Sequence, residues 1–161
     1  MSESLKLDLA DAAATDVLGR ALATAISPLP ETGLTIWLKG QLGAGKTTLV
    51  RALLRGLGHT GRVPSPTYTL VEPYELAVGP VHHVDLYRLV DPGEAEYLGM
   101  SELPAPGGLL LVEWPEQGRG FLPAADLELA LEVAGHGRQV VLVPASRPGH
   151  LAFKRLAKSV N

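Results

Sequence analysis

Runs of apolar residues divide the chain into short strands and amphipathic helices. Alternating or continuous apolar runs predict strands at Leu5–Leu9, Thr35–Leu38, Thr67–Tyr74, Val81–Leu89, Gly108–Trp114, Leu127–Val133 and Arg138–Val143. Apolar residues spaced three and four positions apart predict helices at 12–26, 46–57, 94–100 and 150–159. Asp11 is placed to cap the first of these helices, and Ser27-Pro28 to end it. The order of elements predicts an α/β fold in which helices flank a mixed β-sheet.

The composition is that of one globular domain. The chain has 161 residues, of which 46% are apolar and 19% charged, so we expect a single domain spanning residues 1–161. Cysteine is absent, which excludes disulfides and thiolate chemistry. The net charge of −3 argues against unaided binding of nucleic acid. The sequence shows neither a long apolar span nor a secretory pattern, so we expect a cytoplasmic protein without a membrane segment.

A glycine-rich segment follows the second predicted strand and opens the second predicted helix. Residues 40–47, GQLGAGKT, match the phosphate-binding pattern G-x-x-x-x-G-K-[ST]. Glycines allow successive backbone N–H groups to surround phosphates, and the start of the helix favours the same anions. Lys46 would reach the β- and γ-phosphates, and the Thr47 hydroxyl would bind Mg²⁺. The candidate nucleotide-binding residues are Gln41, Leu42, Gly43, Ala44, Gly45, Lys46, Thr47 and Thr48.

Two carboxylates at the ends of predicted strands could complete a catalytic site with Lys46. Glu113 ends the apolar run GLLLVEW, where a carboxylate would face Mg²⁺ or its waters. Asp85 interrupts the apolar positions of VHHVDLYRL and is a second candidate metal ligand. An alternative for Asp85 is a surface salt bridge with Arg88. For Glu113 a purely structural role is the less favoured interpretation, because an unpartnered carboxylate there would be costly.

The segment Ser65-Pro66-Thr67-Tyr68 lies where many P-loop proteins sense the γ-phosphate. Hydroxyl groups of Ser65 and Thr67 flank a rigid proline and could bind metal or orient water. An ordinary turn before a strand explains the same residues equally well. The histidines lack metal-binding spacing, and we expect one residue of the pair His82-His83 to face the core and the other to be exposed.

Missing motifs narrow the class of nucleotide-binding protein. The sequence has no N-K-x-D guanine-binding motif and no L-S-G-G signature, which argues against a typical GTPase and a transporter ATPase. A small-molecule kinase stays open, although its usual lid of clustered arginines is not evident. A non-catalytic nucleotide switch is a further alternative.

Four segments in this order and spacing resemble the TsaE (YjeE) family of bacterial P-loop ATPases: GQLGAGKTTLVRALLRGLG, VPSPTYTLVEPYE, HHVDLYRL and LVEWPEQG. The resemblance spans roughly residues 15–140. It implies a P-loop NTPase-like fold, with ATP and Mg²⁺ as ligands. It also implies a role in forming N6-threonylcarbamoyladenosine at position 37 of tRNA, through the TsaD–TsaB complex. Contact with tRNA would then be indirect, and ATP hydrolysis would be slow without the partners.

The resemblance assigns roles to matching residues. Lys46 and Thr47 match the phosphate-loop lysine and the Mg²⁺-binding threonine of the family. Residues 65–68 match its SPTY switch segment, and Asp85 and Glu113 match its motif carboxylates. Two further residues of these motifs are candidates for partner contacts, Arg88 and Trp114. Gln41 departs from the family, where an acidic residue is common. Adenine contacts are expected near Asp11–Thr15 and Arg138, without a matching motif.

Overall fold

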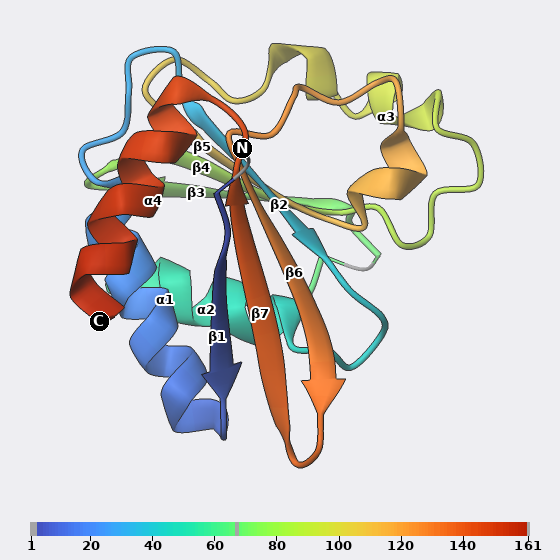
Figure 1. Cartoon of the computed structure of the whole chain (residues 1–161). Helices are drawn as coiled ribbons and strands as arrows, with labels where there is room; N and C mark the ends of the chain where they lie inside the picture. Colours follow the sequence, from blue (N-terminus) through green and yellow to red (C-terminus); the bar gives the residue numbers. More distant parts are fainter. Residues whose placement is uncertain (1–2, 67, 161) are drawn as a thin grey trace.

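One mixed sheet forms the centre of the molecule. A computed structural model describes residues 3–66 and 68–160, and within these residues seven strands have the spatial order β1-β7-β6-β2-β5-β4-β3 (Figure 1). Their bounds are β1 Leu5–Leu9, β2 Leu34–Lys39, β3 Val71–Leu76, β4 Gly79–Asp85, β5 Leu109–Glu113, β6 Leu127–Ala134 and β7 Gly137–Pro144. This architecture confirms the predicted α/β fold with a mixed sheet.

The parallel strands in the middle of the sheet bring three functional segments to one edge. β2 pairs in parallel with β5 and β6, and β4 pairs in parallel with β5. In this register Asp85 lies opposite Glu113, and Leu38 lies opposite Glu113 on the other side. The glycine-rich segment begins directly after β2. The carboxyl ends of β2, β4 and β5 therefore meet at the same edge, where α/β sheets commonly bind ligands.

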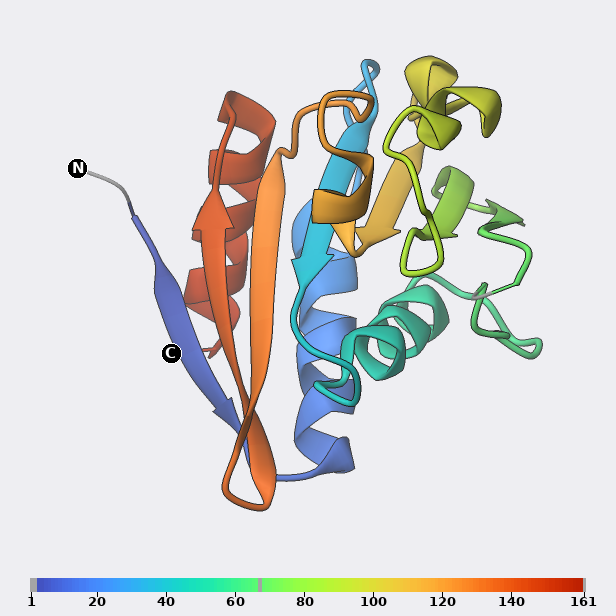
Figure 2. The ribbon, with the colours of Figure 1, turned by 90° about the vertical axis from the view of Figure 1, so that its right-hand side faces the viewer.

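Helices cover both faces of the sheet. On one face lie α1 Ala12–Ile26, α2 Lys46–Gly56 and α4 Arg147–Val160, and α1 packs against both of the others (Figures 1 and 2). Close packing of α1 on α2 depends on Gly19, because a Cβ there would overlap the side chain and backbone of Ala52. The other face carries α3 Glu94–Tyr97 and the 3₁₀ turns Met100–Glu102 and Pro115–Gly118.

Two apolar clusters fill the space between the sheet and the helices on its two faces. The larger cluster joins α1, α2 and α4 to the sheet through alternate residues of β2, namely Leu34, Ile36 and Leu38. The smaller cluster lies on the opposite face and includes Leu110 and Val112 of β5. All five residues of β5 are buried, as predicted for a central strand covered on both sides. No helix in the described part of the chain is long and apolar enough to span a bilayer.

Several elements begin or end at other residues than predicted. β3 begins at Val71 instead of Thr67, because Leu70 donates its N–H to the Pro66 carbonyl in a turn and has a positive φ of 67°. Thr67 itself lies outside the described residues. β4 ends at Asp85 instead of residue 89, and the helix predicted at 94–100 is only Glu94–Tyr97.

The ends of the helices were closer to prediction. Asp11 caps α1 as expected, since its Oδ1 accepts a hydrogen bond of 2.9 Å from the N–H of Ala14. α1 also ends before Ser27-Pro28, as predicted. The last helix begins at Arg147, three residues earlier than predicted, because proline is compatible with the first turn of a helix.

Candidate functional site

The glycine-rich segment forms a tight loop between β2 and α2. Gly43 and Gly45 have φ values of 79° and 104°, a region that favours glycine. A Cβ on Gly40 would overlap the backbone carbonyl of Leu131 on β6. Glycine at these positions lets the loop curl against the sheet and bring its backbone to the start of α2. Tight glycine-rich loops at the start of a helix are a common means of surrounding phosphate groups with N–H donors.

Lys46 is the first residue of α2, and its side chain turns back over this loop. The residue is only 4% exposed, and its Nζ donates to the carbonyls of Gly40 and of Gln41, the latter at 3.0 Å. Its Nζ also lies 4.4 Å from the centre of the Trp114 ring. Burial lowers the pKa of Lys46, and the carboxylates of Glu113 and Asp85 act in the opposite direction. The lysine is therefore held beside both predicted catalytic carboxylates.

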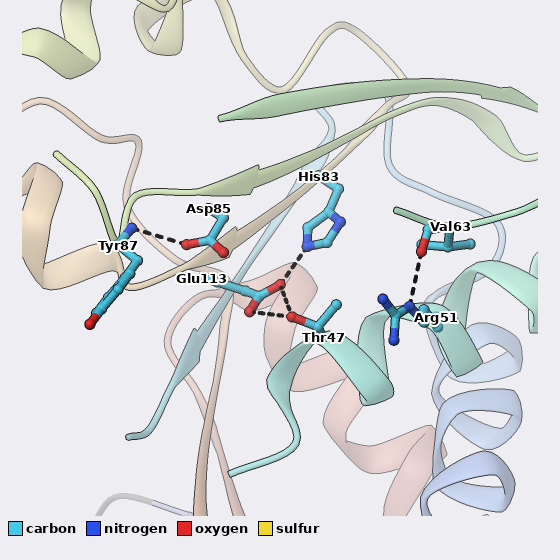
Figure 3. Close-up of polar contacts among 7 residues, drawn as sticks. All are labelled: Thr47, Arg51, Val63, His83, Asp85, Tyr87 and Glu113. Carbon is cyan, nitrogen blue, oxygen red and sulfur yellow. Dashed lines mark hydrogen bonds and ion pairs between the residues drawn. The ribbon is translucent and has the colours of Figure 1, made fainter. Parts of the chain in front are cut away.

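Thr47 and Glu113 meet directly beside the loop. The Thr47 hydroxyl lies 2.9 and 3.1 Å from the two carboxylate oxygens of Glu113 (Figure 3). Glu113 is 2% exposed, and its Oε2 also lies 2.6 Å from the Nε2 of His83. His83 is fully buried, which confirms that one histidine of its pair faces the core. Its neighbour His82 is partly buried, so the prediction that it is exposed was wrong.

Asp85 is the next carboxylate along this edge of the sheet. It is 5% exposed, and its Oδ1 accepts a hydrogen bond of 3.0 Å from the N–H of Tyr87 (Figure 3). Burial raises the pKa of Asp85, and the N–H of Tyr87 opposes this shift. Among the described residues no ion pair joins Asp85 to Arg88, whose guanidinium lies 4.6 Å from the centre of the Tyr68 ring. The alternative of a surface salt bridge for Asp85 was therefore wrong.

These residues line a cavity of about 410 Å³. It brings together most predicted site residues, namely Leu42, Gly43, Gly45, Lys46, Thr47, Thr48, Ser65, Asp85, Arg88, Glu113 and Trp114. Tyr87 also lines it, beside the Trp114 ring at 4.9 Å between ring centres. Four other predicted residues are outside this lining set, namely Gln41, Ala44, Pro66 and Tyr68.

A second cavity of about 200 Å³ adjoins the first through Gly45, Thr48 and Arg138. Its other walls come from the end of β1, the start of α1 and the β6–β7 turn, with Asp11, Thr15 and His136 among the lining residues. The Nη1 of Arg138 donates to the carbonyl of Gly137 at 2.9 Å, and its buried Nε has no hydrogen-bond partner in the described residues. The segments predicted to contact adenine thus meet in one cavity next to the glycine-rich loop.

The donor set fits Mg²⁺ better than a transition metal. The described residues contain no group of three or more histidines, cysteines and carboxylates arranged around one point. Mg²⁺ instead prefers a few protein oxygens together with water and substrate phosphates. The Thr47 hydroxyl and the Glu113 carboxylate already lie within hydrogen-bonding distance, and Asp85 occupies the paired position on the adjacent strand. These oxygens therefore suit a magnesium ion shared with phosphates.

Sequence reasoning missed His83 and Tyr87. The pattern HHVDLYRL held a signal for His83, since alternate residues of a strand share a face and His83 is two positions before Asp85. The contact between His83 and Glu113 joins β4 to β5 across 30 residues of sequence. Only the pairing of the two strands reveals it.

Comparison with known proteins places the chain in a family. The family model "Threonylcarbamoyl adenosine biosynthesis protein TsaE" matches residues 9–140. A tRNA threonylcarbamoyladenosine biosynthesis protein TsaE from Haemophilus influenzae is 44% identical over 119 residues, covering 74% of this chain and 75% of the relative. The protein of the same name from Synechocystis is 46% identical over 118 residues, covering 71% and 72%.

A solved structure agrees with this assignment. The crystal structure of YdiB from Bacillus subtilis superposes with a TM-score of 0.82 and 26% sequence identity, and covers 100% of this chain and 99% of that one. Since the match covers the whole of this chain, it includes the segments that carry the glycine-rich loop and both strand-end carboxylates. The chain belongs to the TsaE family of threonylcarbamoyl adenosine biosynthesis proteins.

Proposed function

We propose that this protein binds and slowly hydrolyses ATP, and acts through the TsaD–TsaB complex in forming N6-threonylcarbamoyladenosine in tRNA. One observation carries the proposal: Lys46, Thr47, Asp85 and Glu113 converge on a single cavity at the carboxyl edge of the parallel strands. A loop lysine, a loop hydroxyl and strand-end carboxylates are the groups that position phosphates in P-loop ATPases. Family membership supports the role in tRNA modification.

The two adjoining cavities would hold different parts of ATP. The triphosphate would lie in the larger cavity, where Lys46 provides positive charge and the loop provides N–H donors. Adenine and ribose would extend into the smaller cavity between Asp11, Thr15 and Arg138. The unpartnered Nε of Arg138 supports a polar contact there, since buried donors usually have partners.

Both carboxylates would contribute to a metal site, and Asp85 would have a second task. Thr47, Glu113 and Asp85 would hold Mg²⁺, which when bound neutralises charge on the β- and γ-phosphates. The carboxylate of Glu113 contacts the Thr47 hydroxyl and the His83 ring. Asp85 has a pKa raised by burial, and its orientation is fixed by the N–H of Tyr87, so it is suited to orient an attacking water.

A second candidate function is a nucleotide switch without hydrolysis. The Tyr68 ring, in the SPTY segment, contacts the Arg88 guanidinium in the loop that follows Asp85. Through this contact, ATP binding could reposition an exposed surface, since Tyr68 is 84% exposed. Complex formation with TsaD–TsaB would then depend on ATP binding alone.

Glu113→Gln separates the two functions. If the protein is an ATPase, E113Q should still bind ATP and should lose about a hundredfold or more in turnover, measured with and without TsaD–TsaB. Glu132→Gln, an exposed change on β6 outside both cavities, is the matched control. Normal complex formation and function of E113Q despite its lost turnover would favour the switch, whereas unchanged turnover would refute the catalytic role of Glu113. Transfer of labelled γ-phosphate to a metabolite instead of water would indicate a kinase.

A further inference from the structure

His83 is a fully buried polar residue in direct contact with the site, and the proposed chemistry does not use it. It lies on β4 with 0% exposure, and its Nε2 is 2.6 Å from the Oε2 of Glu113 (Figure 3). On the neighbouring strand His83 pairs with Leu111, and Asp85 pairs with Glu113. Since alternate residues share a face of the sheet, His83, Asp85 and Glu113 are held on the same face by the backbone.

The surroundings of His83 indicate which of its ring nitrogens faces a partner. An ionised carboxylate can only accept a hydrogen bond, so the ring nitrogen that faces Glu113 would be the donor. The other ring nitrogen, Nδ1, is buried and has no hydrogen-bond partner in the part of the chain that the structure describes. With Nε2 as the donor, Nδ1 can be a lone pair that needs no acceptor. A proton on Nδ1 would instead be a buried donor with no acceptor, which is costly.

The contact restricts a side chain that is otherwise free to rotate. The terminal torsion of a glutamate has a broad energy minimum, so the carboxylate plane needs partners to fix it. Thr47 contacts both carboxylate oxygens, and its hydroxyl can donate only one proton. If the Thr47 hydroxyl turns toward a metal ion, the Glu113 carboxylate loses its hydrogen bond from Thr47. His83 is the partner that stays, because the sheet fixes its position.

We propose that His83 is a positioning residue that orients the Glu113 carboxylate and thereby sets the affinity for Mg²⁺ in the presence of nucleotide. The inference rests on the proposed function, in which Glu113 contributes to holding Mg²⁺. Partners that orient a metal-binding side chain typically change metal affinity by about 10- to 100-fold when they are removed. The affinity for nucleotide without Mg²⁺ should not depend on His83.

Calorimetric titration of ADP at a series of Mg²⁺ concentrations, and without Mg²⁺, tests the proposal. His83→Leu keeps an apolar side chain of similar size and removes the donor. H83L should raise the Mg²⁺ concentration for half-maximal effect by about 10-fold or more, with ADP affinity in the absence of Mg²⁺ within twofold of the parent. His83→Gln places an amide donor near the original position and should recover most of the loss. His82→Leu, on the same strand, is the matched control and should behave as the parent.

An unchanged Mg²⁺ dependence in H83L would overturn the role of His83. An equal loss of ADP affinity with and without Mg²⁺ would also overturn it, because such a loss indicates packing alone. A parent protein that binds ADP equally well with and without Mg²⁺ would instead refute the proposed Mg²⁺ site. The two failures are therefore distinguishable.

Nitrogen-15 NMR of the histidine rings keeps the inference testable if H83L does not fold. In the parent, His83 should carry its proton on Nε2, and this resonance should shift in the Glu113→Gln variant. A ring without a proton on Nε2 would overturn the inference, as would a His83 signal unaffected by E113Q. The measurement uses the full chain without nucleotide, so it does not depend on ATP hydrolysis.

Discussion

Lys46→Met tests the phosphate site most directly. Methionine is similar in length to lysine and removes the ammonium from a position that is only 4% exposed. In the structure this ammonium donates to the carbonyls of Gly40 and Gln41. A bound phosphate must therefore compete with these two carbonyls for the Lys46 ammonium. The cost of the substitution is the difference between the two sets of hydrogen bonds.

The magnitude follows from that exchange. Two hydrogen bonds from an ammonium to an anionic phosphate are worth about 3 kcal/mol each, and two to neutral carbonyls about 1.5 kcal/mol each. The difference is about 3 kcal/mol, or roughly a hundredfold in Kd. If the ammonium made no contacts before binding, the loss would be about 6 kcal/mol, more than 10⁴-fold. The two cases are far enough apart to be distinguished experimentally.

Isothermal titration of ATP with Mg²⁺ gives the required affinities. Lys39→Met is the matched control, since Lys39 ends β2 outside both nucleotide cavities and pairs with Glu128. We expect K39M to bind as the parent does and K46M to bind about a hundredfold more weakly. A loss smaller than about threefold in K46M would refute the phosphate-binding role of Lys46. A loss beyond 10⁴-fold would refute the exchange of contacts.

Two further predictions concern stability. Burial lowers the pKa of His82 in the folded protein below its usual 6.5. As the pH falls, the His82 ring therefore takes up a proton more readily in the unfolded chain than in the folded one. The free energy of unfolding is unaffected by His82 above its usual pKa and decreases below it. In urea unfolding at pH 7.5 and 5.5, His82→Gln should therefore show a smaller acid loss than the parent, and an equal loss would contradict this reasoning. Gly19→Ala should lower the free energy of unfolding by about 1–3 kcal/mol, because the new Cβ overlaps Ala52. A stability equal to that of the parent in the same assay would show that α1 and α2 separate easily.

The sequence contains enough information to locate the phosphate loop and the two carboxylates. The loop pattern is local, and glycine, lysine and threonine have their roles at fixed spacing. Glu113 ends a continuous apolar run, which marks a buried parallel strand, and ligands bind at the carboxyl ends of such strands. Both signals depend only on neighbouring residues, and the structure brings Lys46, Asp85 and Glu113 to the same cavity.

Contacts between distant segments could not be predicted in the same way. His83 reaches Glu113 only because β4 and β5 pair in one particular register. The alternative of an ion pair between Asp85 and Arg88 was wrong for a related reason. Asp85 accepts from the N–H of Tyr87 in a local turn, and Arg88 instead contacts Tyr68 from another part of the chain. Closeness in sequence favoured the ion pair, but the turn directs the two side chains differently.

The buried charges of the site explain why its geometry depends on the sheet. Lys46, Asp85 and Glu113 are each at most 5% exposed, and burying charged groups is costly unless they are paired. In the structure the loop carbonyls partner Lys46, and Thr47 and His83 partner Glu113. A phosphate and a metal ion would replace the loop carbonyls and the Thr47 hydroxyl as partners, and would leave those on β4 in place. In the proposed function, specificity for a metal-bound triphosphate would then depend on the strands, which hold His83 and Asp85 in register with Glu113 whichever partner the loop provides.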